Sequence, residues 1–434
     1  MKVCVVALGK IGLPLAVQIA SKGYEVIGAD VSAEVVGLVN SAIPPFPGEA
    51  HLDELLGEAI SQGLLNATTN TTEAVSESEV VVVVVPLMTD SEGVPDFSAM
   101  DSATSDIAAG LQHGTLVSYE TTLPIGTTRN RFGPMIEEKS GLRLGSHFEL
   151  IHSPERVFSG RIFADLRRYP KLVGGVDEKS TKRGVEFYEA ILDFDERPDL
   201  QKSNGVWPMA SVEAAEMAKL AETTYRDVNI ALANEFAAFS ESHGIDVAEV
   251  ITASNSQPFS HIHRPGVAVG GHCIPVYPRF YLSGHPGARL VETAREVNLA
   301  VPDRVVSSVA ERLGGMAGAR VLILGAAYRG GVKETAYSGV FDLVESVRAR
   351  GGSAVVEDPL YENEELVALG LEPWDGEDVD AVIVQADHSE YAKLTPSDLP
   401  GAKVIFDGRN ILDGSRWAQS EVILNVIGQG DTAS

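Results

Sequence analysis

Short apolar runs alternate with helical patterns along the first part of the chain. The runs rich in β-branched residues cover residues 3–8, 24–30, 80–85, 115–120 and 148–152. Such short runs with few polar positions are typical of strands buried on both faces, and their alternation with helices is typical of a parallel sheet. The pattern therefore predicts an α/β domain whose parallel sheet has helices on both faces.

A long segment without helix breakers follows. Residues 211–243 contain neither Pro nor Gly, and the segment stops before Gly244. Its apolar positions recur at helical spacing: Met217, Leu220, Val228, Leu232, Phe236 and Phe239. One helix of this length would span on the order of 50 Å, more than a compact domain needs. We therefore predict a central helix that connects two domains and carries the interface of a homodimer.

A second alternating series begins after Gly314 and Gly315. It predicts a second α/β domain, with strands at residues 320–325, 353–357, 381–385 and 403–406. The length of 434 residues also favours two or three domains.

The expected domains are residues 1–200 (α/β), 201–314 (a central helical domain) and 315–434 (α/β). The small, polar residues 429–434 are expected to fray.

Composition and net charge exclude several classes of protein and of binding partner. Apolar residues make up 44% of the chain, and the longest pure valine run, 80–85, is far too short to span a bilayer. The net charge of −27 disfavours a nucleic-acid partner, which requires a basic face. Two cysteines exclude a disulfide framework and a cysteine-rich zinc site. We expect a cytoplasmic protein without a resident metal and without a membrane anchor.

The end of the first predicted strand carries a candidate nucleotide site. Gly9 and Gly12 follow the strand and open a helix, and Asp30 ends the second strand 21 residues after Gly9. These features match most of the dinucleotide fingerprint of Rossmann-like domains, in which glycines admit a pyrophosphate and the acid binds a ribose diol. Ala7 replaces the first glycine of that fingerprint. Because Asp30 would repel a 2′-phosphate, NAD is favoured over NADP.

A second candidate centre is Cys273, in the Gly- and Pro-rich segment 265–278. A lone cysteine is more often a small buried hydrophobe, which is how we interpret Cys4 in the first strand. Near Cys273, however, Gly270 and Gly271 would allow a ligand close to the backbone. A nucleophilic thiol is therefore the favoured interpretation.

Six motifs occur together in one order. They are Gly9-Lys-Ile-Gly-Leu-Pro14, Thr121-Thr-Leu-Pro-Ile-Gly-Thr127, Ser153-Pro-Glu-Arg-Val157, Glu216-Met-Ala-Lys-Leu220, Gly270-Gly-His-Cys-Ile-Pro275 and Asp407-Gly-Arg-Asn410. In this set the chain resembles, over essentially its whole length, the nucleotide-sugar 6-dehydrogenases of the UDP-glucose/GDP-mannose dehydrogenase family.

The resemblance implies a four-electron oxidation of the C6 alcohol of a nucleotide sugar to a carboxylate, with two molecules of NAD. Cys273 matches the family nucleophile, which forms a thiohemiacetal and then a thioester. Lys219 matches the lysine that stabilises negative charge on the C6 oxygen. Glu155 matches the carboxylate of the hydrolysis step, and Thr122 the hydroxyl that helps to place a water.

The resemblance also implies binding residues. Those expected at the cofactor are Gly9, Lys10, Ile11, Gly12, Asp30, Pro86, Glu120 and Thr122. Those expected at the UDP-sugar substrate are Glu155, Arg156, Val157, Lys219, Arg264, Gly270, Gly271, Tyr277 and Arg409. The guanidinium of Arg409 is suited to paired phosphate oxygens.

The chain departs from the family at several of these positions. Thr223, which we include among the catalytic residues, stands where the family usually has Asn, and Tyr277 where it often has Asp. Ala336 replaces an arginine, whose substrate contact is expected to move to Arg329.

The segment that begins at Ser153 resembles the branch that acts on UDP-2-acetamido sugars. UDP-N-acetylmannosamine or UDP-N-acetylglucosamine is therefore favoured, with UDP-glucose as the alternative. Two other functions stay open: a single two-electron oxidation with a structural Cys273, and a catalytically silent nucleotide-sugar binding protein. The two-electron enzyme would form one NADH per sugar, and the binding protein would form none.

Overall fold

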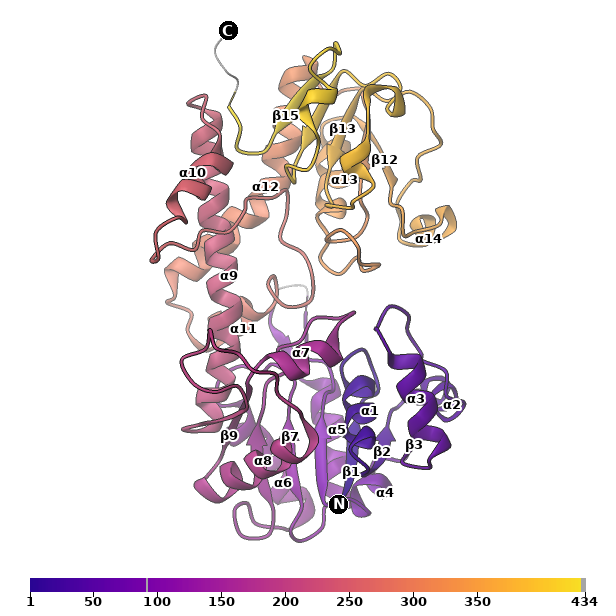
Figure 1. The fold of residues 1–434 in the computed structure, drawn as a ribbon, viewed down its shortest axis with the longest axis vertical. Helices are drawn as coiled ribbons and strands as arrows, with labels where there is room; N and C mark the ends of the chain where they lie inside the picture. The colour runs from indigo at the N-terminus through magenta and orange to yellow at the C-terminus, as the bar shows by residue number, and fades with distance from the viewer. Residues whose placement is uncertain (91–92, 431–434) are drawn as a thin grey trace. The chain divides into compact units, whose positions relative to one another are not determined.

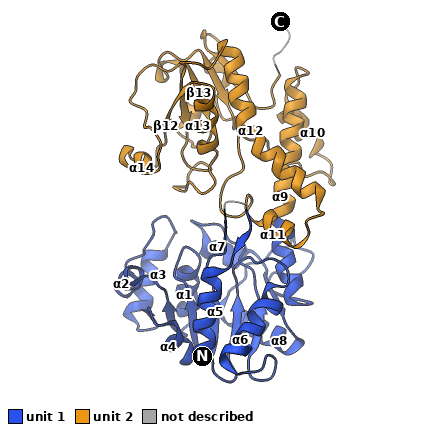
Figure 2. Cartoon of the chain, turned by 180° about the vertical axis from the view of Figure 1, so that it is seen from behind, with its two compact units in different colours: residues 1–222 blue, residues 223–434 orange. Residues whose placement is uncertain are grey.

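The computed structural model describes residues 1–90 and 93–430, in two compact units, residues 1–222 and 223–434 (Figure 2). Each unit contains one main sheet of predominantly parallel strands, as the alternating pattern predicted. The boundary between the two compact units falls inside the long helix, between residues 222 and 223. The expected division into three domains stays a prediction. No helix in the described residues is both long enough and apolar enough to cross a bilayer.

The sheet of the first unit has eight strands (Figure 1). In spatial order they are β10 (Val206–Met209), β9 (Lys171–Gly175), β8 (Glu149–His152), β7 (Leu116–Tyr119), β4 (Val80–Val83), β1 (Lys2–Val6), β2 (Glu25–Ala29) and β3 (Leu65–Thr68). The six strands from β8 to β3 are parallel, in the order of a Rossmann-like sheet. β9 runs antiparallel to β8, and β10 is parallel to β9.

Helices cover both faces of this sheet. One face packs against α1 (Gly12–Ser21), α2 (Ala33–Asn40), α3 (Leu52–Ser61), α7 (Ile162–Arg168) and α8 (Glu178–Ile191). The other side carries α4 (Thr71–Ser76), α5 (Ser98–Gly110), a π-helical turn (Thr128–Phe132) and α6 (Gly133–Ser140). A short hairpin, β5 (Met88–Thr89) and β6 (Pro95–Asp96), precedes α5. Alternate residues of β7 show the two faces, since Ser118 meets Tyr188 of α8 and Tyr119 meets Thr104 of α5.

The long central helix is confirmed. α9 covers Val212–Glu241, against the expected 211–243. α9 is followed, in the second unit, by α10 (Val247–Ser254), α11 (Tyr277–Gly284) and α12 (Arg289–Leu313).

The sheet of the second unit has five parallel strands. In spatial order they are β12 (Ser353–Glu357), β11 (Arg320–Leu324), β13 (Ala381–Val384), β14 (Val404–Asp407) and β15 (Ile423–Val426). One face packs against α12 and α13 (Gly339–Ala349). α14 (Asn363–Ala368) follows β12, and three 3₁₀ turns lie at Tyr391–Lys393, Pro396–Asp398 and Gly414–Arg416.

The other face of the second sheet packs against loop and 3₁₀ residues, among them Trp374, Tyr391 and Trp417, and not against long helices. One expectation needs correction. Part of the expected frayed tail is ordered, because the Gly430 N–H donates to the Ile245 carbonyl oxygen and Gly430 is buried. Residues 431–434 of that tail lie outside the described residues.

A carboxylate occupies the same position in both sheets. In the first unit, Asp30 follows β2 and accepts the Leu8 N–H from the loop after β1, at 2.8 Å. In the second unit, Asp358 follows β12 and accepts the N–H groups of Ala326 and Ala327 from the loop after β11. The two carboxylates differ in access: Asp30 is half-buried, whereas Asp358 is buried against His388.

Candidate functional site

The loop after β1 has the shape of a dinucleotide cradle. α1 begins at Gly12, so its N-terminal N–H groups end at this loop, and the field of the helix favours a pyrophosphate there. A Cβ on Gly12 would lie 1.9 Å from the Ala7 carbonyl oxygen, so only glycine fits. A Cβ on Gly9 would meet nothing within 4 Å, which leaves space beside the backbone. Lys10 is exposed and Ile11 half-buried in the same turn.

Ala7 takes over the conformation of the missing glycine. Its φ is +76°, in the left-handed region that favours glycine. Its N–H donates to the Ala29 carbonyl oxygen, which fixes the turn against β2. The turn of the fingerprint is therefore formed in spite of the substitution. Together with Asp30, which is held by the Leu8 and Ser32 N–H groups, these residues fit NAD.

The loop after β7 carries Thr122, which is buried. Thr121 anchors this loop to the end of β4 through its hydroxyl and the Val85 carbonyl oxygen, next to the exposed Pro86. Pro86 and Thr122 thus lie at the carboxyl ends of neighbouring strands, where ligands bind in sheets of this type.

Glu216 of α9 holds the far end of that loop. Its carboxylate accepts the N–H of Gly126 at 2.5 Å, the N–H of Thr128 at 2.9 Å and the Thr128 hydroxyl at 2.6 Å. Glu216 is completely buried, and this burial raises its pKa to about 7. Sequence analysis noted Glu216 only as part of a motif and assigned it no role.

The segment after β8 contains Glu155, Arg156 and Val157. The Glu155 N–H donates to the Glu120 carbonyl oxygen, which binds this segment to the end of β7. Arg156 forms an ion pair with Glu222 of α9 at 2.8 Å. Val157 is half-buried against the core of the first unit. The structure therefore brings together, in one unit, the segments of Glu155 and Thr122 that were assigned to hydrolysis.

Glu120 follows β7 and is buried. Its carboxylate accepts hydrogen bonds from Lys171 at 2.7 Å and from the Tyr188 hydroxyl at 2.6 Å. The expected contact of Glu120 with the cofactor stays a prediction.

Two assigned residues lie one turn apart on α9. Lys219 and Thr223 are both buried, and their spacing of four residues places them on one face of the helix. Asp227, a further turn along, belongs to this stripe and forms an ion pair with Arg295 of α12 at 3.3 Å. Buried polar groups on one helix stripe are typical of a site or of a buried network.

The loop of Cys273 packs on the carboxyl edge of the second sheet. Gly271, with φ of +90°, donates its N–H to the Ala336 carbonyl oxygen at 2.8 Å. A Cβ on Gly270 would lie 2.5 Å from the Cβ of Tyr328, which explains this glycine. Cys273 is half-buried, and its carbonyl oxygen accepts the Tyr277 N–H at the start of α11.

Arg409 lies at the same edge, after β14. Its guanidinium donates to the carbonyl oxygen and, at 3.2 Å, to the side-chain oxygen of Gln385. A Cβ on Gly266 would lie 2.6 Å from Nη1 of Arg409, so the segment before Cys273 runs directly beside the guanidinium. Burial lowers the pKa of Arg409. The second unit thus brings together Arg409, Gly270 and Gly271.

The remaining assigned residues are less constrained. Arg264 is exposed, and Tyr277 is half-buried with its ring 5.6 Å from that of Phe280. Arg329 lies on the loop after β11, and its Nε donates to the Tyr328 hydroxyl at 3.2 Å. The expected transfer of a contact from position 336 to Arg329 stays a prediction.

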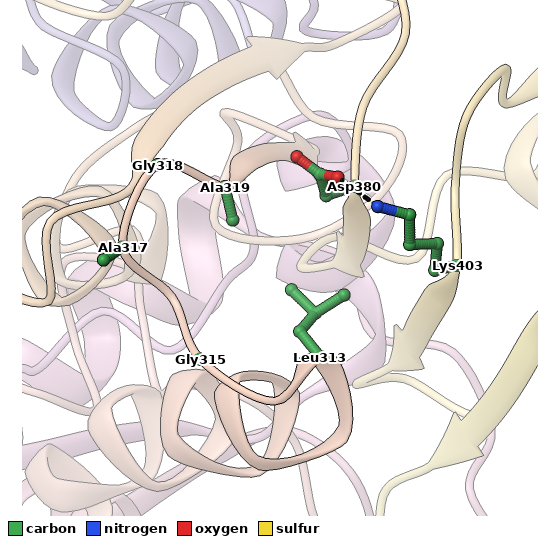
Figure 3. A pocket seen from close by; sticks show the side chains of 7 residues that line it. All are labelled: Leu313, Gly315, Ala317, Gly318, Ala319, Asp380 and Lys403. Carbon is green, nitrogen blue, oxygen red and sulfur yellow. Dashed lines mark hydrogen bonds and ion pairs between the residues drawn. The ribbon is translucent and has the colours of Figure 1, made fainter.

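A separate hollow of about 210 Å³ lies at the opposite edge of the second sheet (Figure 3). Its lining residues precede β11, β13 and β14 or end α12: Leu313, Gly315, Ala317, Gly318, Ala319, Asp380 and Lys403. Asp380 and Lys403 pair with each other there at 2.8 Å. Because Arg409 follows the carboxyl end of β14, this hollow is not part of the candidate site.

Comparison with known proteins gives matches along most of the chain. Residues 1–192 match the NAD binding domain of the UDP-glucose/GDP-mannose dehydrogenase family, residues 213–300 its central domain and residues 322–414 its UDP binding domain.

Individual proteins are similar over the full length. The UDP-N-acetyl-D-mannosamine dehydrogenase of Pyrococcus horikoshii is 34% identical, with 99% of this chain and 100% of that protein covered. An NDP-N-acetyl-D-galactosaminuronic acid dehydrogenase of Ralstonia solanacearum is 32% identical, with 96% and 97% covered. The solved structure of the UDP-D-ManNAc dehydrogenase from Pyrococcus horikoshii superimposes with a TM-score of 0.88 at 33% identity, with 99% and 100% covered.

Proposed function

Because the chain belongs to the UDP-glucose/GDP-mannose dehydrogenase family and is an NAD-dependent UDP-sugar dehydrogenase, we propose that it oxidises C6 of a UDP-2-acetamido sugar to the carboxylate. UDP-N-acetylmannosamine is the favoured substrate, with UDP-N-acetylglucosamine and then UDP-glucose as alternatives. The observation that carries the proposal is the full-length similarity to an enzyme named for UDP-N-acetyl-D-mannosamine. The Ser153-Pro-Glu-Arg-Val157 segment supports it.

Cys273 is the proposed nucleophile. NAD, when bound, accepts a hydride from C6 in each of the two oxidations. After the first, the thiol adds to the aldehyde and forms a thiohemiacetal, whose oxidation gives a thioester. A half-buried thiol suits this role, because it is open to a substrate on one side and held by the protein on the other.

Four side chains are proposed to act on the oxygen at C6 and on the water. The Lys219 ammonium, buried on α9, stabilises negative charge on that oxygen, and Thr223 supplies a hydroxyl one turn away. Glu155 takes a proton from the water that attacks the thioester, and Thr122 orients the water. Hydrolysis breaks the bond between C6 and sulfur, and the thiol is restored.

The UDP part is proposed to bind at the carboxyl edge of the second sheet. Arg409 would bind diphosphate oxygens, and the backbone of Gly270 and Gly271 would line the sugar. Arg156, Val157, Arg264 and Tyr277 are the other proposed contacts.

NADH stoichiometry tests the proposal. The protein is incubated with excess NAD and limiting UDP-N-acetylmannosamine, UDP-N-acetylglucosamine or UDP-glucose, and the product mass is measured. Two NADH per sugar and one new carboxylate identify the four-electron reaction and its substrate. One NADH per sugar would demonstrate a two-electron enzyme, and NAD or UDP-sugar binding without NADH would demonstrate a binding protein.

Asp30 sets the proposed preference for NAD. In Asp30→Asn the side-chain oxygen still accepts the Leu8 N–H, but the charge that attracts ribose hydroxyls and repels a 2′-phosphate is removed. A hydrogen bond to a charged group is worth about 1.5–3 kcal/mol, so the ratio of NAD to NADP kcat/KM should fall about 10- to 100-fold. Asp53→Asn, at an exposed acid on α3, is the control and should leave the ratio unchanged.

An apolar stripe on α9 supports a homodimer. Within the second unit, Tyr225, Leu232, Phe236 and Phe239 are exposed, and their spacing places them on one face of the helix. Phe239 is 61% exposed, an unusual state for a large apolar residue in a folded chain. We propose that a second copy of the chain covers this stripe, as the length of the helix predicted.

The double variant Leu232→Glu and Phe239→Glu should convert the dimer to a monomer, because four charges would be buried in one interface. Analytical ultracentrifugation measures the mass. Val367→Glu, at an apolar side chain of α14 that is also 61% exposed, should leave the mass unchanged. A wild-type protein that sediments as a monomer at micromolar concentration would contradict the proposal.

The two free cysteines agree with the cytoplasm as the proposed place of action.

A further inference from the structure

A buried polar cluster lies behind Glu155 at one edge of the first sheet. Glu120 follows β7, Glu155 follows β8 and Lys171 begins β9. Because β9 runs antiparallel to β8, the first residue of β9 lies at the edge where β7 and β8 end. Tyr188 of α8 reaches the cluster from the face of the sheet that packs against α1 and α8. The reversal of β9 is therefore what places a lysine between two carboxylates.

The contacts of this cluster are short and mutual. Nζ of Lys171 donates to Oε2 of Glu120 and to Oε2 of Glu155, both at 2.7 Å. The Tyr188 hydroxyl donates to Oε1 of Glu120 at 2.6 Å and shares a hydrogen bond with the Ser118 hydroxyl at 2.8 Å. Lys171 also lies 4.8 Å from the centre of the Tyr188 ring.

The exposed fraction of the side chains decreases from Glu155 through Lys171 to Glu120. The side chain of Glu155 is 12% exposed, that of Lys171 5% and that of Glu120 0%. Glu155 is thus the member nearest to solvent, and Lys171 connects it to an acid sealed inside the protein.

We propose that Lys171 is a positioning residue for Glu155, and that Lys171 and Glu120 together remove the proton that Glu155 takes from the hydrolytic water. The proposal rests on the proposed function, in which Glu155 serves thioester hydrolysis. The water oxygen bonds to C6, the bond from C6 to the Cys273 sulfur breaks with its electron pair left on sulfur, and one water proton goes to Glu155. Lys171 then takes that proton while it gives one of its own to Glu120.

The charges in the cluster drive the proton in that direction. Burial raises the pKa of Glu120 to about 7. Burial alone would also raise the pKa of Glu155, but the Lys171 charge outweighs this effect and lowers it. The proton is therefore more stable on Glu120 than on Glu155, and Lys171 keeps its charge because the two carboxylates raise its pKa.

Two other titratable groups beside the cluster, Tyr188 and His152, stay neutral, and the charged Arg156 next to Glu155 is paired with Glu222. Burial raises the pKa of Tyr188 well above its usual value and lowers that of His152, on β8, to about 3. With Glu120 ionised the cluster carries one net negative charge, and with Glu120 protonated it carries none. Proton acceptance by Glu120 thus removes an unbalanced buried charge.

The competing explanation is that Lys171 forms an ion pair that serves stability alone. Accumulation of the thioester on Cys273 in a Lys171 variant distinguishes the two explanations. Lys171→Met should still allow both oxidations but should slow hydrolysis about 10²-fold, the usual contribution of a positioned base. The enzyme is mixed with NAD and the UDP-sugar on which the wild type turns over, and then quenched. We expect a burst of two NADH per subunit and a thioester adduct on Cys273, measured by intact-protein mass.

Two further variants are matched to this one. Lys171→Arg keeps the charge, but a guanidinium does not release a proton at neutral pH, so hydrolysis should stay slow and the adduct should persist. Wild-type turnover in Lys171→Arg would overturn the proton transfer through Lys171. Lys179→Met removes an exposed lysine that pairs with Glu149 in the same unit, and it should behave as wild type. Loss of both NADH signals in Lys171→Met, with a normal thermal melt and no adduct, would overturn the proposal, as would unchanged turnover.

Glu120→Gln tests the acceptor separately and is close in shape to the native residue. In the wild type, the decay of the thioester should become faster as the pH rises through about 7, because only ionised Glu120 accepts a proton. In Glu120→Gln that rise should be absent and decay slower. An unchanged pH profile would overturn the proposal, and this variant decides the question if Lys171→Met does not fold. A wild type that oxidises no UDP-sugar would refute the proposed function instead.

Discussion

Cys273→Ser should reduce NADH formation from the UDP-sugar by about 10³-fold or more, the scale of loss when a covalent nucleophile is removed. In the proposed mechanism the thiol carries the aldehyde between the two oxidations, and a serine hydroxyl is a much weaker nucleophile at neutral pH. Any NADH that the variant still forms should stop at one per sugar, because the second oxidation needs the covalent intermediate. Steady-state absorbance at limiting sugar measures both quantities.

Cys4 provides the control for this experiment. It is completely buried in β1, and burial raises the pKa of its thiol to about 12, so it is inert. Cys4→Ala should lower stability by about 1 kcal/mol and leave the stoichiometry at two NADH. If Cys273→Ser retained two NADH per sugar at a normal rate, the covalent mechanism would be wrong and the cysteine structural.

Gly12→Ala should abolish productive NAD binding. The new Cβ would lie 1.9 Å from the Ala7 carbonyl oxygen, an impossible contact. The oxygen is a backbone atom and the position of a Cβ is fixed by its own backbone, so no side-chain rotation relieves the contact. α1 would have to move off the loop after β1, where the pyrophosphate is proposed to bind. We expect a destabilisation of about 1–3 kcal/mol, typical of overpacking, and NAD affinity weaker by about 10²-fold or more.

Calorimetric titration with NAD and a thermal melt separate the two effects. Gly37→Ala, in α2, is the matched control, because its Cβ would meet nothing within 4 Å and alanine favours a helix. Gly37→Ala should melt at or above the wild-type temperature and bind NAD normally. Wild-type NAD affinity in Gly12→Ala would mean that the cofactor does not use the N-terminus of α1.

The elements that sequence analysis found are those with one dominant signal. Apolar runs predicted β1, β4 and β7 because these strands are buried on both faces, and the absence of Gly and Pro predicted α9. β3 and β10 were missed, since β3 alternates polar residues at an edge of the sheet and β10 contains Pro208. These residues form strands because their backbones hydrogen-bond to the neighbouring strands β2 and β9, and the sequence of one segment does not reveal such pairing.

The residues of the candidate site also divide into those that a local motif indicates and those that it does not. The positions of Asp30 and Arg409 at strand ends were predictable from their motifs, while their binding roles stay predictions. The position of Lys171 was not predictable, because a lysine before a short apolar run is usually a solvated strand end. Its burial depends on the reversal of β9, and no local pattern indicates strand direction. The left-handed conformation of Ala7 was equally hidden, since alanine gives no sign of a positive φ.

The buried Asp358 has a consequence for the timing of the reaction. At the position where Asp30 awaits a ribose, Asp358 already accepts two backbone N–H groups and contacts His388 at 3.2 Å, so the second unit has no open acid there for a dinucleotide. In the proposed mechanism, each subunit would then use one NAD site for both oxidations. NADH would leave and NAD would arrive between the two oxidations, and the proposed bond to Cys273 would retain the half-oxidised sugar during this exchange.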